Sequence, residues 1–239
     1  MKLISLLFVG AVLIYASTMD DALNAFKAKE YKKAMKLYAQ EAEQNNSKAQ
    51  NALSYLYFNG LGTQKDVEKG RYWLTQAALQ ADSVAQYDMA MMYLGGYNFD
   101  QDYKQALFWL ERSSDLGNRD AQYNLALMYY QGDGVDINVT KTALYLEQSA
   151  KQGHQKAKQL VGRIYMQILD FDKAIEWLNI NADEGDAEAI YLLSEIYCSK
   201  GNYSESQKYK ERAIELNYPE AESLTCKEAL DNKASEKSK

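Results

Sequence analysis

The chain has 239 residues, of which 27 are basic and 33 acidic, which gives a net charge of −6 and a pI of about 5.0. This acidic charge argues against nucleic acid, which binds basic stripes, so neither DNA nor RNA is expected as a partner. With Pro219 as its one proline, it leaves long stretches free for uninterrupted helices. The composition therefore favours an all-α body.

The first residues have the order of a secretory signal. Met1-Lys2 precedes an apolar run over residues 3–16 that is short for a membrane span. Ile14-Tyr15-Ala16 forms a tolerable cleavage site, so we expect a signal peptide at residues 1–16 with cleavage after Ala16. The protein would then be periplasmic or secreted, with no membrane span after cleavage. A buried first helix or an uncleaved anchor is the alternative.

A ladder of tyrosines runs through the middle of the chain, with separations of 36, 36, 36 and 32 residues. Its members are Tyr57, Tyr93, Tyr129, Tyr165 and Tyr197. Each tyrosine is preceded by an alanine eight residues earlier, an apolar residue four residues earlier and a small residue three residues earlier. Before Tyr129 these are Ala121, Leu125 and Ala126. These offsets share one helix face. A fixed period of this length predicts a repeat array. Its five units are residues 47–82, 83–118, 119–154, 155–186 and 187–218.

A second helix in each repeat has its own column of large residues. The column contains Leu37, Trp73, Trp109, Tyr145, Trp177 and Tyr209. An aromatic ligand groove is one interpretation of the three tryptophans. Because leucine and tyrosine take the same position, core packing is the interpretation we favour.

The joints between repeats are also periodic. Gly117, Gly153 and Gly185 follow the second helices and predict left-handed helix ends. Asn217 tolerates that conformation at the last joint, whereas Ala81 fits it poorly. The next column predicts N-caps at Asp82, Asn118, His154 and Asp186.

The loop inside each repeat changes along the chain. It reads Gly60-Leu61-Gly62 and Gly132-Asp133-Gly134, with Gly95-Gly96-Tyr97 between them. After Tyr165 the next position of the second-helix column, Trp177, comes four residues earlier in the sequence than the 36-residue period predicts. We therefore expect a loop shortened by four residues there, between helices of unchanged length.

These segments resemble the Sel-one-like repeat, a relative of the tetratricopeptide repeat. The resemblance rests on stretches such as Ala121 to Tyr129 followed by Gly132-Asp133-Gly134-Val135, and it covers residues 47 to about 222. Residues 17–46 look like a plain tetratricopeptide helix pair. The resemblance implies a right-handed α-α superhelix, or solenoid, whose first helices line a concave face. Members of the family act mostly as adaptors and assembly scaffolds, and a cysteine-rich branch is linked to β-lactam binding or hydrolysis.

No catalytic or metal site is expected. His154 is the single histidine and falls in the N-cap column, so a helix-joint role is favoured over that of a base or ligand. The serine-acylation motifs and the phosphate-binding glycine loops are absent, so no cofactor is expected either.

The binding surface is expected at those positions of the first helices where the residue type differs from repeat to repeat. Two positions before each ladder tyrosine stand Tyr55, Met91, Leu127, Arg163 and Glu195, and Asp88 and Asn124 belong to a second variable column. By resemblance to the family, these positions face the concave groove, with an apolar end near Tyr55 and a polar end at Glu195. The alternative is that they fill the tighter inner curve of the superhelix.

The C-terminal end is expected to close the array. A capping helix over residues 219–231 is predicted to follow Pro219, with a disordered tail at 232–239. Cys198 and Cys226 lie on neighbouring first helices in this scheme, so a disulfide between them is plausible in an exported chain. Two buried free thiols are the alternative.

We therefore interpret the chain as an exported scaffold or adaptor that binds another protein through its concave face. One alternative is a toxin-neutralising, immunity-type inhibitor in the periplasm. Another is a cell-wall or β-lactam-handling enzyme, which the presence of only two cysteines makes less attractive.

Overall fold

The computed structural model describes residues 18–226, in which every regular element is a helix. The all-α prediction is confirmed. The predicted signal peptide, its cleavage site after Ala16 and the tail at 232–239 lie outside the described residues. The chain divides at residue 125, inside helix α7, into an N-terminal unit that also includes residues 133–135 and a C-terminal unit.

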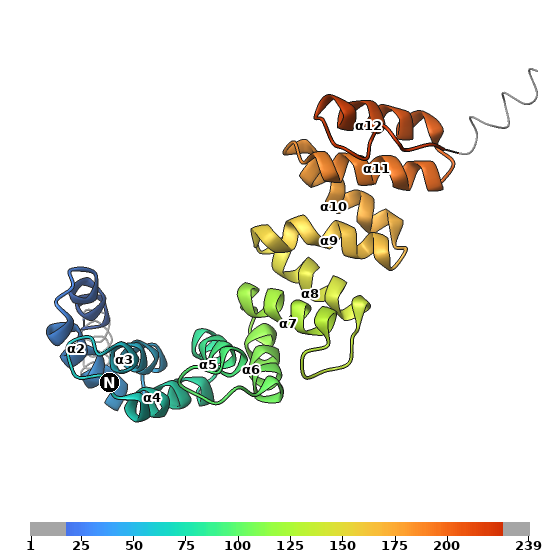
Figure 1. Ribbon diagram of the computed structural model, residues 1–239. Helices are drawn as coiled ribbons and strands as arrows, with labels where there is room; N and C mark the ends of the chain where they lie inside the picture. The colour runs from blue at the N-terminus through green and yellow to red at the C-terminus, as the bar shows by residue number, and fades with distance from the viewer. Residues whose placement is uncertain (1–17, 227–239) are drawn as a thin grey trace, which may run out of the picture. The chain divides into compact units, whose positions relative to one another are not determined.

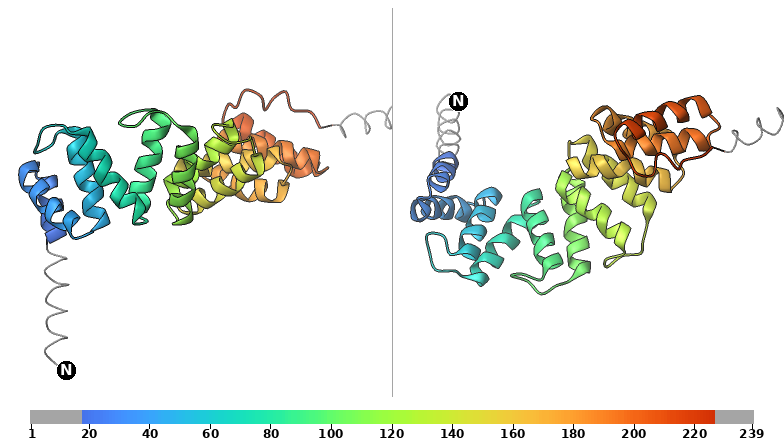
Figure 2. Two further views of the ribbon diagram at one scale, coloured as in Figure 1. Left: turned by 90° about the horizontal axis from the view of Figure 1, so that it is seen from below. Right: turned by 45° about the horizontal axis from the view of Figure 1, so that its top comes forward.

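The helices alternate between first and second members of each pair (Figure 1). The first helices are residues 18–27, α3 (Ser47–Asn59), α5 (Ser83–Gly95), α7 (Arg119–Gln131), α9 (Gln155–Gln167) and α11 (Ala187–Ser199). The second helices are α2 (Tyr31–Glu43), α4 (Val67–Leu79), α6 (Tyr103–Asp115), α8 (Val139–Lys151), α10 (Phe171–Asp183) and α12 (Tyr203–Glu215). In the N-terminal unit, the helices follow one another in chain order (Figure 2). Contacts also join α3 to α5. In the C-terminal unit α9 likewise touches α11.

The predicted core columns of the first helices are buried. Each alanine, apolar and small position lies inside, as Ala85, Met89 and Ala90 of α5 illustrate with exposures of 0 to 2%. The small residue permits close approach of the second helix. At Gly162, an added β-carbon would lie 2.8 Å from the Leu178 side chain. The tryptophan column packs at the edge of this core, where Trp109 and Trp177 are buried.

One backbone hydrogen bond closes every helix pair from residue 47 onward. The N–H of the residue that caps the second helix donates to the carbonyl of the ladder tyrosine, over 2.8 to 3.0 Å. The donors are Asp66, Asp102, Asn138, Asp170 and Asn202. Donor and acceptor are nine residues apart for Tyr57 but five apart for Tyr165. The shortened loop therefore removes four residues without altering this closure.

The joints between repeats have the expected conformations. Gly117, Gly153 and Gly185 have φ of +81° to +87°, and Ala81 and Asn217 adopt +59° and +58°. All four residues of the N-cap column accept hydrogen bonds from the first turn of their helices. The position of Ala81 shows that the repeat imposes a left-handed turn even where the side chain disfavours it.

The predicted capping helix at 219–231 is not helical in its described part. Residues 219–223 form turns and residues 224–226 have no regular structure. Lys210 Nζ donates to the carbonyl of Leu224 over 2.7 Å, and Ala221 is fully buried. These contacts hold the non-helical segment against the last helix pair.

A buried polar cluster crosslinks three helices of the C-terminal unit. Glu147 of α8 accepts hydrogen bonds from Lys151, from the ladder hydroxyl of Tyr165 and, over 3.0 Å, from Lys173 of α10. Burial alone would raise the pKa of Glu147, but these three donors outweigh it and lower the pKa to about 2. Burial and the bond to Glu147 raise the pKa of Tyr165 to about 12.

The loop glycines give a test of the repeat geometry. At Gly62, with φ +77°, a β-carbon would lie 2.5 Å from the carbonyl oxygen of Tyr31, whereas Gly117 has open space around it. We expect Gly117→Ala to cost about 1 kcal/mol, from backbone strain alone. Gly62→Ala adds the steric clash and should cost a further 1 to 3 kcal/mol, approximately. Urea unfolding of both variants measures the difference, and equal costs would contradict the close approach.

The polar cluster gives a pH dependence with a defined sign. The fold lowers the pKa of Glu147 from 4.5 to about 2. The ionised Glu147 therefore contributes fully to the free energy of unfolding above pH 4.5, and this contribution is lost as the pH falls toward 2. That contribution is at most about 3 kcal/mol. The gap in unfolding free energy between wild type and Glu147→Gln should narrow over this range. Urea titrations at pH 6, 4 and 2.5 measure the gap, and a constant gap would argue against an ionic role.

Candidate protein-binding site

A pocket of about 480 Å³ lies on the N-terminal unit between α3, α5 and the loops that follow them. Tyr55 and Phe58 of α3 and Met91 and Met92 of α5 supply its apolar lining. Two residues of the predicted surface, Tyr55 and Met91, therefore line one hollow. Tyr55 is 51% exposed, so its ring is accessible to a partner.

A third predicted residue, Asp88, forms the polar part of the same pocket. Asn51 Nδ2 donates to Asp88 Oδ2 over 3.1 Å and so links α3 to α5. Burial raises the pKa of Asp88 above its ordinary value of 3.8, against the opposing effect of the Asn51 hydrogen bond, and the charge of Asp82 raises it further. The carboxylate is held in place but incompletely compensated.

Tyr97 also lines this pocket and was not predicted. It takes the place of Leu61 in a loop where Gly96 has φ +66° and Asn98, with φ +64°, replaces the second glycine. The ring lies against Gly95, so a β-carbon there would collide with it. The signal in the sequence was the departure from the glycine-x-glycine spacing at this loop.

A second, more apolar hollow of about 370 Å³ adjoins Tyr55 on the other side. It is lined by Leu23, Phe26, Tyr38, Ala52 and Tyr55. The rings of Phe26 and Tyr55 meet edge to face with centroids 6.0 Å apart. Tyr55 therefore stands between two hollows, and replacing it changes both.

The predicted residues Asn124 and Leu127 do not line the pocket. Asn124 Nδ2 donates to the Tyr87 hydroxyl over 3.3 Å and to the backbone carbonyl of Asp120 over 2.9 Å. Leu127 is partly buried in the C-terminal unit.

The expected polar end of the groove is engaged within the C-terminal unit. Arg163 forms an ion pair with Glu188, and the Tyr191 hydroxyl donates to Glu195 over 2.8 Å. The ring of Tyr218 stacks on Tyr191 at 5.0 Å. Arg163 and Glu195 already have partners in the same chain, so they are weaker candidates for binding than Tyr55, Met91 and Asp88.

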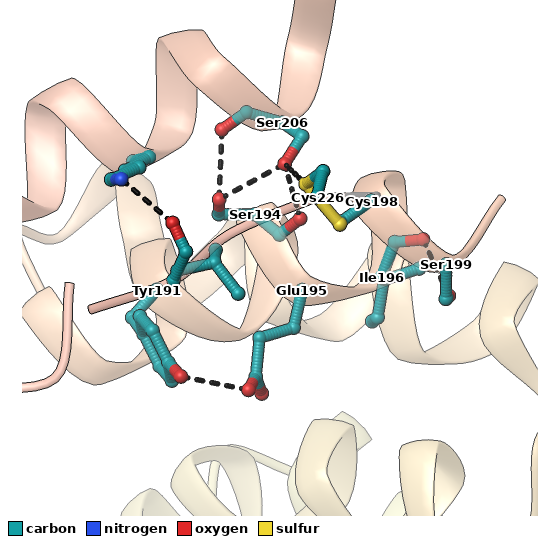
Figure 3. The surroundings of a disulfide bond; sticks show 10 residues. Tyr191, Ser194, Glu195, Ile196, Cys198, Ser199, Ser206 and Cys226 are labelled. Carbon is teal, nitrogen blue, oxygen red and sulfur yellow. Dashed lines mark hydrogen bonds between the residues drawn. A yellow bond between two sulfur atoms is a disulfide. The ribbon is translucent and has the colours of Figure 1, made fainter. Parts of the chain in front are cut away.

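A disulfide joins Cys198 of α11 to Cys226, with Cα atoms 5.7 Å apart (Figure 3). The Ser206 hydroxyl of α12 lies 3.3 Å from the Cys226 sulfur, and it also donates to the carbonyl of Ser194. The bond fastens the segment after α12 to the last helix pair, as a staple at the end of the array.

The described residues contain no group of three or more side chains that could hold a metal ion. His154 Nδ1 accepts from the N–H of Ala157 over 3.1 Å and so caps α9, as its place in the N-cap column predicts. Between residues 18 and 226 there is no helix with the length and apolar character of a membrane span.

Comparison with known proteins identifies the repeat. The Sel1 repeat profile matches residues 47–82, 83–118, 119–154 and 162–186. A Sel1 repeat protein from Oxalobacter formigenes has a similar structure, with a TM-score of 0.67 and 23% identity over 82% of this chain and 84% of that one. The protective antigen c5321 of uropathogenic Escherichia coli, which has an SLR fold, gives a TM-score of 0.59 and 29% identity over 75% of this chain. This chain covers 40% of that antigen's length. No curated protein matches the sequence.

Proposed function

Because the chain belongs to the Sel1 repeat family, whose helical scaffold is typical of protein binding, we propose that it is an exported adaptor that binds another protein through the pocket of its N-terminal unit. The observation that carries the proposal is the convergence of Tyr55, Met91 and Asp88 on one hollow. Aromatic and methionine side chains around a partly buried polar group are the usual make-up of a protein contact.

The sequence and the disulfide support export. Residues 1–16 have the charged, apolar and small order of a secretory signal. A disulfide between Cys198 and Cys226 is stable in the periplasm or outside the cell and rare in the cytosol.

Replacing the pocket residues tests the adaptor role. We expect Tyr55→Ser with Met91→Ala to reduce retention of the partner from a periplasmic extract at least tenfold, because an interface loses most of its energy with its central apolar anchors. The matched control is Tyr72→Ser with Phe108→Ala. These residues are 56% and 42% exposed on the second helices of the same unit and are not part of the pocket lining.

Helical circular dichroism should be unchanged in both double variants. Retention by the pocket variant equal to that of the control would refute the assignment, and hydrolysis of nitrocefin by the wild type would contradict a purely binding role.

Export has its own test. The protein purified from a periplasmic extract should begin at Ser17, and titration of the denatured, unreduced chain should find no free thiol. Intact Met1 in a soluble cytoplasmic fraction, or two free thiols, would contradict export to an oxidising compartment.

A further inference from the structure

The two charged side chains that line the pocket differ in how far they are buried. Asp88 and Lys65 are the charged side chains of its lining. Lys65 is exposed on the loop after α3, whereas Asp88 is partly buried in α5. Within residues 18–226 the structure has no ion pair for Asp88. A cation brought by a ligand would therefore find a carboxylate that is hydrogen-bonded to an amide but forms no ion pair.

The carboxylate is presented at a fixed place. The amide of Asn51 holds Oδ2, and Asn51 lies on the neighbouring helix, so the side chain cannot swing freely. A neutral amide offsets only part of the cost of burying a charge, which is largest when no opposite charge is near. Asp82 adds negative potential from the start of the same helix, and burial raises the pKa of Asp88. A positive group at this point would offset the cost of burying the carboxylate, which Asn51 compensates only in part, and the negative potential of Asp82.

The surroundings of Asp88 are apolar and adaptable. Tyr55, Phe58, Met91 and Met92 line the rest of the pocket, and Tyr97 adds a ring that is 52% exposed. Methionine side chains adjust to irregular shapes, and tyrosine gives a large contact area at low entropic cost. These residues can cover an aliphatic stem or an apolar neighbour of the cation.

Resting on the proposed function, we propose that the pocket binds a partner segment that carries a lysine or arginine next to a large apolar side chain. The cation pairs with Asp88, and the apolar side chain packs on Tyr55 and Met91. The pairing also agrees with the charge of the whole chain, since a net charge of −6 attracts a basic partner at long range. Asp88 is the one carboxylate of the pocket lining, and the described residues contain no group of three or more histidine, cysteine, aspartate or glutamate side chains that could hold a metal ion, so we infer a side-chain cation as the occupant.

Selection of peptides tests the inference directly. A phage-displayed library of random dodecapeptides is panned against the purified full protein, against Asp88→Asn and Asp88→Arg, and against Asp115→Asn. Asp115 is an exposed carboxylate at the end of α6 in the same unit and does not line the pocket, which makes it the matched control. Wild type and the control should enrich peptides with a basic residue beside an apolar one.

The charge reversal gives a result that unfolding cannot imitate. Asp88→Arg should enrich acidic peptides in place of basic ones. For a basic peptide selected on wild type, fluorescence anisotropy should show a dissociation constant about tenfold higher for Asp88→Asn, equivalent to about 1.4 kcal/mol. Arginine amide alone, at millimolar concentration, should not displace the peptide, because the apolar contacts are missing.

Other outcomes would overturn the inference. These are selected peptides without a basic bias, the same peptides on Asp88→Arg as on wild type, displacement by arginine amide alone, or no enrichment at all. In each of these cases the adaptor role still stands if Tyr55→Ser with Met91→Ala abolishes retention of the natural partner. If that double variant keeps its partner, the proposed function fails whatever the peptides show.

Discussion

The structure depends on the hydrogen bond between the ladder tyrosine carbonyl and the N–H that caps the following helix. It occurs in all five pairs from Tyr57 to Tyr197, and it fixes the point where the second helix starts relative to the end of the first. Once that point is fixed, the small residue three positions before the tyrosine faces the second helix. The alanine, apolar and small columns follow from this closure, because each must fill a space of constant size.

The same constraint explains where variation is permitted. The closure needs the two bonded residues but not the loop between them, so the loop contains seven residues before α8 and three before α10. In the repeat of α5 the loop keeps its length but replaces the glycine-x-glycine pattern, which places Tyr97 in the pocket wall. A binding surface can thus change from repeat to repeat while the core columns stay the same.

The features that recur in every repeat could be predicted from the sequence, whereas the contacts between individual side chains could not. Core columns, left-handed joints and N-caps repeat, so each prediction was supported several times over. The predicted binding residues separate for a reason that no period reveals: Arg163 and Glu195 find partners in Glu188 and Tyr191, whereas Asp88 finds only the amide of Asn51. The described part of the helix expected after Pro219 likewise depends on a pairwise contact, because residues 219–223 form turns and Lys210 of α12 donates to the carbonyl of Leu224.

The placement of charge distinguishes the two units. In the C-terminal unit, Glu147 is buried and accepts hydrogen bonds from two lysines and a tyrosine hydroxyl. This compensation stabilises the fold and leaves Glu147 with little to offer a ligand. In the N-terminal unit, Asp88 combines partial burial with a single neutral donor. Natural sequences break local rules mainly where function requires it. Asp88, with one neutral donor among the apolar side chains of the pocket, is such an exception, and it lies beside the one loop between residues 47 and 218 that departs from the glycine pattern while keeping its full length. Both exceptions converge on the same hollow, which is why we propose the binding role for the pocket between α3 and α5 and not for the array as a whole.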